Sequence, residues 1–346
     1  MPTRKPLIII TGFLGSGKTT LLRSLVSSLA GEGLKVDVIL NDIANAELDA
    51  ATVRDAAPVK ITPIDASCAC CESLEALVSA CEDTAQCEAE LLLVELNGTG
   101  DPLGLLESFT MLEQRLPFSP RLCVCVIDVR HWGLRGELTP LERRQMGAAG
   151  LYLLSHTNRS EPADIHRVEL ALAEEFPNSK RITAKQLADA VIRRSPLSAG
   201  ERRSPKLQQR AVRGVDGDAT DEIHLLSHQV QGCQIPLPPK LRRSSVERLL
   251  NKLPDEVLRA KALVKTVEEP GTRWLFERCG TEVSPSPIPV RGVTRLPSSL
   301  TCTGIRLNPD AIRNLVSVAF GTAAASGDQN LRSAQDGSSL LDASTK

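Results

Sequence analysis

Residues 7–19 read Leu-Ile-Ile-Ile-Thr-Gly-Phe-Leu-Gly-Ser-Gly-Lys-Thr. The first five form a short apolar run, which is typical of a strand buried on both faces of a parallel sheet. The last eight match the pattern G-x-x-x-x-G-K-[ST], and residues 19–29 continue with apolar side chains at helical spacing. The order of strand, glycine-rich turn and helix predicts a loop whose backbone N–H groups surround a phosphate.

Within this loop, Lys18 is expected to reach the β- and γ-phosphates of a nucleoside triphosphate, and the Thr19 hydroxyl to hold Mg²⁺. The alternative is a chance match on a glycine-rich turn, which the flanking strand and helix disfavour. The residues expected to bind the nucleotide belong to the loop and the first turn of the helix: Gly12, Gly15, Ser16, Gly17, Lys18, Thr19 and Thr20.

Further apolar runs indicate how the sheet continues. They alternate with amphipathic stretches at 73–81 and 161–176, and strands that alternate with helices predict βα units. We therefore expect an α/β fold with a doubly wound, mostly parallel P-loop NTPase sheet. The other strands are expected at residues 36–40, 59–64, 91–94, 122–127 and 151–154.

The composition changes after the first domain, which is expected to span residues 1–194. Residues 195–221 are rich in Ser, Pro, Gly and Arg with little apolar periodicity, as in a linker. Apolar content recovers over 222–320, where we expect a smaller α+β domain. Residues 321–346 are small and polar and are expected to form a disordered tail.

The chain has 346 residues, of which 42% are hydrophobic and 24% charged, as in an ordinary soluble globular protein. It has 41 Lys and Arg against 42 Asp and Glu, and only 3% aromatic residues. Nucleic acid is therefore not an expected partner. Because no apolar run approaches the roughly 20 residues needed to cross a bilayer, we expect a cytoplasmic protein with no membrane partner.

Residues 67–71 read Ser-Cys-Ala-Cys-Cys and place three of the ten cysteines within four positions. Thiolates suit Zn²⁺ or Cu(I), and cysteines of a cytosolic chain are free thiols or metal ligands. Cys68, Cys70 and Cys71 are therefore candidate metal ligands, with a fourth ligand from elsewhere in the chain or from water. The alternative is that they are buried apolar side chains that bind no metal.

Residues 92–102 read Leu-Leu-Val-Glu-Leu-Asn-Gly-Thr-Gly-Asp-Pro, and residues 38–42 read Val-Ile-Leu-Asn-Asp. With the loop and its flanks at 10–22, and Val-Leu-Arg-Ala-Lys at 257–261, they resemble the signatures of the CobW family of P-loop GTPases. The resemblance spans about residues 7–310. It implies a GTPase that handles Zn²⁺ or a similar thiophilic metal and serves a client metalloprotein. Because no residue is an obvious catalytic base, we expect slow intrinsic turnover.

The resemblance also implies roles for individual residues. Glu95 and Gly98 correspond to the family's E-x-x-G version of Walker B, so Glu95 would order Mg²⁺ and the Gly98 backbone would move toward the γ-phosphate. Lys18, Glu95 and Gly98 are therefore the candidate catalytic residues. Asp42 stands where switch I of the family has Asn-Glu, and it joins Thr19 and Glu95 as an expected metal ligand.

The motif by which GTPases read guanine, N-K-x-D, is altered here. The matching stretch is Ser155-His156-Thr157-Asn158, in which Asn158 replaces the Asp and His156 the Lys. An amide offers one acceptor and one donor, so it cannot satisfy both guanine donors. We expect Ser155 and Asn158 to contact the base, with GTP as the favoured nucleotide.

Several polar residues have two interpretations. Asp128 ends a strand and either faces the site or caps the next turn. Arg259 and Lys261 alternate on an expected strand and are interpreted as a solvated face. Three histidines could bind metal, although exposed or internally bonded histidines are more common: His131, His224 and His228.

Two other functions stay open. A P-loop ATPase or small-molecule kinase would use the same loop, with a pocket for a phosphoryl acceptor and no metal beyond Mg²⁺. A degenerate module would bind nucleotide poorly and act by regulation. The altered N-K-x-D motif favours the degenerate module, whereas the intact phosphate loop opposes it.

Overall fold

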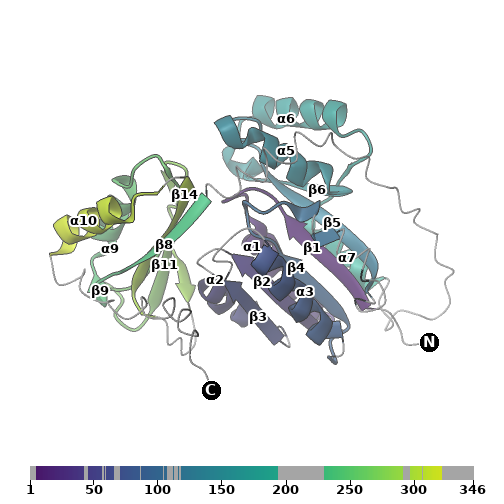
Figure 1. Ribbon diagram of the computed structural model, residues 1–346, viewed down its shortest axis with the longest axis horizontal. Coiled ribbons are helices and arrows are strands. Elements are labelled where there is room, and N and C mark those ends of the chain that lie inside the picture. The colour runs from purple at the N-terminus through teal and green to yellow at the C-terminus, as the bar shows by residue number, and fades with distance from the viewer. Residues whose placement is uncertain are drawn as a thin grey trace, which may run out of the picture.

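The computed structural model describes residues 5–42, 46–56, 58, 60–65, 71–85, 87–103, 105–106, 112, 116, 118–193, 230–290, 297–305 and 307–321. These residues form two sheets flanked by helices (Figure 1). The linker expected at 195–221 lies outside the described residues, as does the tail expected at 321–346 apart from its first residue. Across the described ranges, no helix is long and apolar enough to cross a membrane.

The first sheet is parallel throughout and has the strand order β3-β2-β4-β1-β5-β6-β7, which confirms the expected doubly wound α/β fold. Residues 7–10 of its central strand have no exposed surface, because helices cover both faces. The strands are β1 (Lys5–Thr11), β2 (Val36–Asp42), β3 (Lys60–Asp65), β4 (Leu91–Glu95), β5 (Phe118–Asp128), β6 (Leu151–Ser155) and β7 (Lys180–Arg181).

Side chains of β1 alternate between two apolar layers. Ile8 and Ile10 pack with helices α1 and α7, whereas Leu7 and Ile9 pack with α3 on the opposite face. Period-two alternation is what a strand buried on both sides requires. The helices of this half are α1 (Lys18–Gly31), α2 (Ala46–Val53), α3 (Cys71–Ala85), α5 (Thr139–Gly147), α6 (Pro162–Glu175) and α7 (Ala184–Ile192), with 3₁₀ turns at Arg54–Ala56, Gly136–Leu138 and Thr157–Arg159.

The second sheet has the strand order β12-β11-β10-β14-β8, with β13 beside β11 and β9 beside β10. All of its pairs are antiparallel except the pair of β9 and β10. Helices α9 (Arg243–Asn251) and α10 (Pro309–Phe320) pack on one face, which confirms the expected α+β unit. The strands are β8 (Val230–Pro236), β9 (Lys240–Leu241), β10 (Val257–Thr266), β11 (Arg273–Cys279), β12 (Glu282–Val283), β13 (Ile288–Val290) and β14 (Ser299–Ile305).

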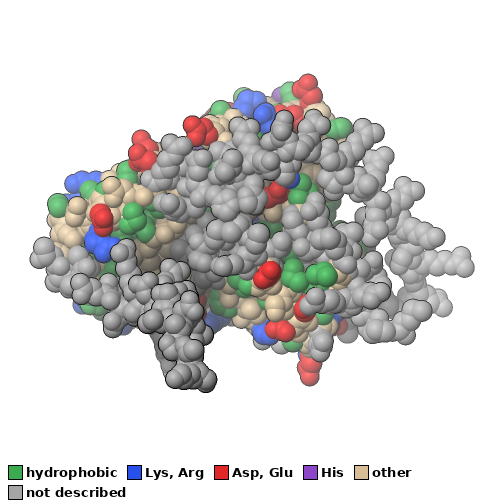
Figure 2. Space-filling model, viewed as in Figure 1, with side chains coloured by type: hydrophobic (Ala, Val, Ile, Leu, Met, Phe, Trp, Pro, Cys, Tyr) green, Lys and Arg blue, Asp and Glu red, His purple; other side chains and the backbone are tan. Residues whose placement is uncertain are grey.

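Two apolar clusters join the second sheet to the first. Phe13 and Leu14 of the glycine-rich loop pack with Leu258 of β10, and Leu48 of α2 packs with Leu263 of β10. One face of the second sheet therefore lies against the loop and α2, and Figure 1 shows α2 beside this sheet. On the described part of the surface in Figure 2, acidic and basic side chains are interspersed, in keeping with the net charge of −1.

Candidate nucleotide site

The glycine-rich loop connects the end of β1 to the start of α1. Gly12, Gly15 and Gly17 have φ angles of 132°, 73° and 95°, a region that side chains disfavour. A Cβ at Gly12 would lie 2.3 Å from the carbonyl oxygen of Val126, so only glycine fits there. The loop thus has the backbone curvature that the motif predicts for surrounding a phosphate.

Lys18 lies beneath this loop with its side chain buried. Its Nζ donates to the carbonyl oxygens of Gly12 and Phe13, at 3.0 Å and 3.2 Å. Burial lowers the pKa of Lys18 to about 8. Ser16 is also buried, and its hydroxyl has no hydrogen-bond partner among the described residues. Because charged phosphate oxygens accept more strongly than neutral carbonyls, both side chains suit an anion held in the loop.

Three oxygen-bearing side chains, those of Thr19, Asp42 and Glu95, belong to the edge of the sheet where β1, β2 and β4 end. The Thr19 hydroxyl donates to Oε1 of Glu95 over 2.8 Å. Glu95 is paired in register with Ile10 of β1 and Leu40 of β2, so Asp42 ends its strand on the same edge of the sheet. Hydroxyl and carboxylate oxygens are the ligands that Mg²⁺ prefers.

Two carboxylate oxygens at this edge are buried without hydrogen-bond partners in the part of the chain that the structure describes: Oε2 of Glu95 and Oδ1 of Asp42. Burial raises the pKa of Glu95 to about 7, and the neighbouring Asp49 adds to the rise. A buried carboxylate oxygen is costly unless a donor or a cation compensates it. The residues present therefore fit a bound Mg²⁺.

Gly98 follows β4 and lies against the phosphate loop. A Cβ on Gly98 would be 2.7 Å from the backbone nitrogen of Leu14, so its backbone approaches the loop more closely than a side chain allows. Nε2 of Gln145 donates to the carbonyl oxygens of Gly98 and Gly100, at 3.1 Å and 3.0 Å. This contact fixes the turn beside the phosphate loop.

The interpretation of Arg259 and Lys261 as a solvated face is wrong. Lys261 has no exposed surface and forms an ion pair with Asp49 of α2. Arg259 has only 11% of its side chain exposed and lies 3.7 Å from Oδ2 of Asp42 and 3.3 Å from Oε1 of Glu277. The physical reason is that this face of β10 packs on α2 and the loop, so its alternating charges are paired across the contact rather than hydrated.

The cluster of charges shifts the pKa values of its carboxylates in opposite directions. Burial would raise the pKa of Asp42, but the charges of Lys261, Arg259 and Lys18 outweigh it and hold that pKa below its ordinary value. Burial raises the pKa of Asp49 despite the same cations. Asp42 therefore ionises more readily than Asp49.

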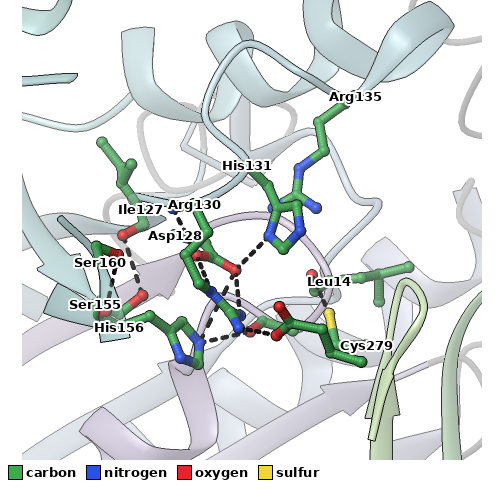
Figure 3. A network of polar contacts seen from close by, with 12 residues as sticks. Leu14, Ile127, Asp128, Arg130, His131, Arg135, Ser155, His156, Ser160 and Cys279 are labelled. Atoms are coloured by element: carbon green, nitrogen blue, oxygen red, sulfur yellow. Dashed lines mark hydrogen bonds and ion pairs between the residues drawn. The ribbon is translucent and has the colours of Figure 1, made fainter. Parts of the chain in front are cut away.

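Asp128 is at the centre of a second polar network, shown in Figure 3. Its buried carboxylate accepts two hydrogen bonds from the Arg130 guanidinium, at 3.0 Å and 2.9 Å, and lies 3.0 Å from Nδ1 of His131. Burial opposes ionisation, but these partners hold the pKa of Asp128 well below its usual range. Arg130 also forms an ion pair with Glu282, so the network links both sheets.

Three residues of the stretch that matches N-K-x-D, at and after the end of β6, lie in different surroundings. Nε2 of His156 lies 3.2 Å from the carbonyl oxygen of Gly15, so the histidine ring contacts the phosphate loop. The Ser155 hydroxyl donates to the carbonyl oxygen of Ile127 at 3.0 Å and ties β6 to β5. Asn158 is exposed on the following 3₁₀ turn. Ser155 also lies beside the loop, because a Cβ on Gly17 would be 3.7 Å from the Cβ of Ser155. The structure thus places Ser155 and His156 against the loop and leaves Asn158 exposed.

One cavity includes the phosphate loop and the face of the second sheet. Thr19, Thr20 and Glu95 line it from the first sheet, and Arg259 and Cys279 line it from the second. The sequence offered no signal for Cys279, whose Sγ lies 3.6 Å from the carbonyl oxygen of Leu14 and close to the unsubstituted Cα of Gly15. A triphosphate in this cavity would contact both halves of the molecule.

The cysteine cluster cannot be placed in the same way. Cys68 and Cys70 lie outside the described residues, as do His224 and His228, and only the backbone of Cys71 is described, at the start of α3. In the residues that are described, no group of three or more His, Cys, Asp and Glu is arranged to hold a metal ion. The described cysteines whose side chains are placed are free thiols.

Residues 6–183, which are 178 of the 346, match the family model of the CobW/HypB/UreG nucleotide-binding domain. The zinc chaperone CobW of Pseudomonas aeruginosa is 23% identical, over 63% of this chain and 64% of the relative. The zinc chaperone YjiA of Escherichia coli is 28% identical over 45% of this chain and 50% of the relative. The zinc-regulated GTPase metalloprotein activator 1 of Dictyostelium discoideum is 33% identical over 30% of this chain and 24% of the relative. The chain therefore spans less than two thirds of the length of each of these relatives.

Among solved structures, the zinc-bound YjiA GTPase of E. coli is 19% identical and aligns with 92% of this chain and 99% of its own, at a TM-score of 0.39. A TM-score this low supports no inference about function. The family model is the stronger finding, because it covers more than half of the chain and includes the phosphate loop, Glu95 and Gly98. The chain belongs to the CobW/HypB/UreG family of nucleotide-binding proteins.

Proposed function

We propose that this protein binds and hydrolyses GTP and couples its nucleotide state to the binding or transfer of Zn²⁺ or a similar thiophilic metal. The observation that carries the proposal is the 2.8 Å hydrogen bond from the Thr19 hydroxyl to Glu95, beside the unpartnered oxygens of Glu95 and Asp42. A phosphate loop with its lysine and a set of oxygen ligands are what phosphoryl transfer to water requires.

Each residue of the site has a separate role in the proposed hydrolysis. Lys18 would move its hydrogen bonds from the loop carbonyls to the β- and γ-phosphate oxygens and neutralise charge there. Thr19, Glu95 and Asp42 would hold Mg²⁺, which supplies further neutralisation of the phosphates. Gly98 can approach the γ-phosphate because it has no side chain to meet Leu14. We expect slow intrinsic turnover, raised by metal or by a client protein.

The topology supports coupling to the cysteine cluster. Asp42 and Asp65 are partners at the ends of the neighbouring parallel strands β2 and β3. The chain continues from Asp65 through residues 66–70 to Cys71 at the start of α3. A movement of Asp42 toward a bound triphosphate would therefore act on the strand that leads directly into Cys68 and Cys70, as in switches ordered by a γ-phosphate.

The test of the nucleotide part is hydrolysis of GTP, ATP and XTP, each with and without Zn²⁺. We expect GTP to be the best substrate and Zn²⁺ to change its rate. Turnover of ATP alone would replace the GTPase with an ATPase or kinase, and failure to bind any triphosphate would make the chain a degenerate module. A GTPase rate that Zn²⁺ does not change would overturn the proposed coupling between hydrolysis and metal binding.

The test of the metal part replaces Cys68, Cys70 and Cys71 together by Ser. Serine hydroxyls do not substitute for thiolates toward Zn²⁺, so one tight site should be lost in competition with a chelating dye. Cys87→Ser is the matched control, because Cys87 is a partly exposed free thiol that comes after the end of α3, whereas Cys71 begins that helix. Unchanged metal stoichiometry in the triple variant would contradict the role of the cluster.

A further inference from the structure

We propose that Arg259, from the second sheet, contacts the phosphates of the bound nucleotide and stabilises the charge that develops on them during hydrolysis. The proposal rests on the GTPase function proposed above. It makes the second sheet part of the catalytic site, because a strand distant in sequence supplies a second cation in addition to Lys18 of the phosphate loop.

The position of Arg259 is the first support. It lines the same cavity as Lys18, Thr19 and Glu95, which surround the expected position of the phosphates. Its Nη1 lies 3.7 Å from Oδ2 of Asp42, so the guanidinium stands beside one of the expected Mg²⁺ ligands. A side chain exposed by 11% has little water to solvate it and depends on nearby anions.

The bonding of the guanidinium is the second support. In the described residues, Arg259 makes one hydrogen bond, from Nη2 to Glu277 at 3.3 Å, and its Nη1 lies 3.7 Å from Asp42. A guanidinium carries five N–H donors in a planar fork that matches phosphate oxygens. It can therefore keep Glu277 as its anchor and still direct donors to a phosphate.

The anchoring of the strand is the third support. Lys261, two residues along β10, forms a buried ion pair with Asp49 of α2, and this contact holds the strand against the first sheet. Glu277 is the register partner of Lys261 on β11 and also bonds Arg259. The guanidinium is therefore positioned by two fixed contacts, as preorganised electrostatic stabilisation requires.

The charge of the cavity favours a polyanion. Its lining side chains include six Lys and Arg against four Asp and Glu. The cations are Lys18, Arg23, Arg130, Arg159, Arg259 and Arg278, and the anions are Asp49, Glu95, Glu277 and Glu282. Among these arginines, Arg259 lies 3.7 Å from Oδ2 of Asp42, an expected Mg²⁺ ligand, and is therefore the candidate for the phosphate contact.

The test compares Arg259→Ala and Arg259→Lys with Lys265→Ala, which removes an exposed charge from the same strand. In single-turnover hydrolysis of GTP by the full chain, we expect Arg259→Ala to lower the rate about a thousandfold or more, as for arginines that stabilise phosphoryl transfer. Arg259→Lys should recover only part of this loss, and Lys265→Ala should have no effect. Added guanidinium chloride at non-denaturing concentration should partly rescue Arg259→Ala alone.

A second measurement separates contact from folding and from the GTPase proposal itself. Arg259→Ala should weaken the binding of a non-hydrolysable GTP analogue more than the binding of GDP, with both affinities measured directly. A folded Arg259→Ala variant with wild-type hydrolysis, or equal losses for both nucleotides and no rescue by guanidinium, would overturn the phosphate contact. If the wild type binds GTP without hydrolysing it, the GTPase proposal fails, while the binding comparison still decides whether Arg259 touches the phosphates.

Discussion

Lys261 of β10 and Asp49 of α2 form an ion pair between the two halves of the protein, and the lysine side chain has no contact with solvent. Helix α2 comes four residues after Asp42, the last residue of β2 and an expected ligand of Mg²⁺. The second sheet therefore holds the helix that follows the end of β2. Any displacement of α2 on nucleotide binding must carry this buried pair with it or break it.

Lys261→Met should lower the free energy of unfolding by roughly 3–5 kcal/mol, because it leaves Asp49 as an uncompensated buried charge. The double variant Lys261→Met with Asp49→Leu should recover most of the loss, since apolar replacement of a buried pair is often neutral. Urea unfolding measures both, with Lys265→Met as the exposed control on the same strand. A double variant no more stable than the single one would contradict the pairing.

Much of the first half could be predicted from the sequence because its determinants are local. Residues 7–19 specify a buried strand, a turn restricted to glycine and a helix start, and the structure places Lys18 and Thr19 accordingly. Residues 60–65 form a strand despite Pro63, because β3 is an edge strand, where a missing N–H is tolerated. The strands at the centre of the sheet were recognisable because burial on both faces makes them continuously apolar.

The contribution of the second sheet could not be predicted in this way. Arg259 and Lys261 alternate with apolar residues as a solvated face would, and nothing local shows that α2 covers them. The contact of Cys279 with Leu14 joins residues 265 positions apart. Sequence periodicity reports which residues share a face, whereas the partner of that face is set by tertiary packing.

Lys18→Ala should abolish binding of GTP and ATP while leaving the protein folded. The side chain is buried, but within the described ranges its hydrogen bonds go to the loop carbonyls of Gly12 and Phe13, so its removal costs a phosphate contact rather than core packing. Fluorescent nucleotide titration measures affinity, and circular dichroism measures the fold. Lys35→Ala is the control, because Lys35 pairs with Glu88 on the exposed surface. Near-wild-type affinity in Lys18→Ala would refute the phosphate-loop assignment.

Glu95→Gln should change how stability depends on pH in the nucleotide-free protein. Burial raises the pKa of Glu95 from 4.5 to about 7, so between these values the folded state binds a proton that the unfolded state has lost. The free energy of unfolding contributed by this group therefore falls as pH rises through that interval. Glu95→Gln removes the titration and should flatten the fall.

The measurement is urea unfolding at several pH values between about 4.5 and 7.5. Glu174→Gln, on the exposed surface of α6, makes the same chemical change and should follow the wild-type curve. The stabilising effect of Glu95→Gln should be greatest at the high end of the range. If Glu95→Gln and Glu174→Gln give parallel curves, burial does not raise the pKa of Glu95 in the folded protein.

Asn158→Asp should raise the affinity for GTP relative to XTP. Asn158 is exposed at the end of β6, where its amide is accessible to a base, and His156 of the same stretch contacts the phosphate loop. A carboxylate accepts from both the ring N–H and the exocyclic amine of guanine, whereas an amide mispairs with one of them at a cost of about 1–3 kcal/mol. That corresponds to roughly tenfold to a hundredfold in affinity. Direct binding of both nucleotides to wild type, Asn158→Asp and the exposed control Asn178→Asp measures it, and a preference that does not move would place the guanine contact elsewhere.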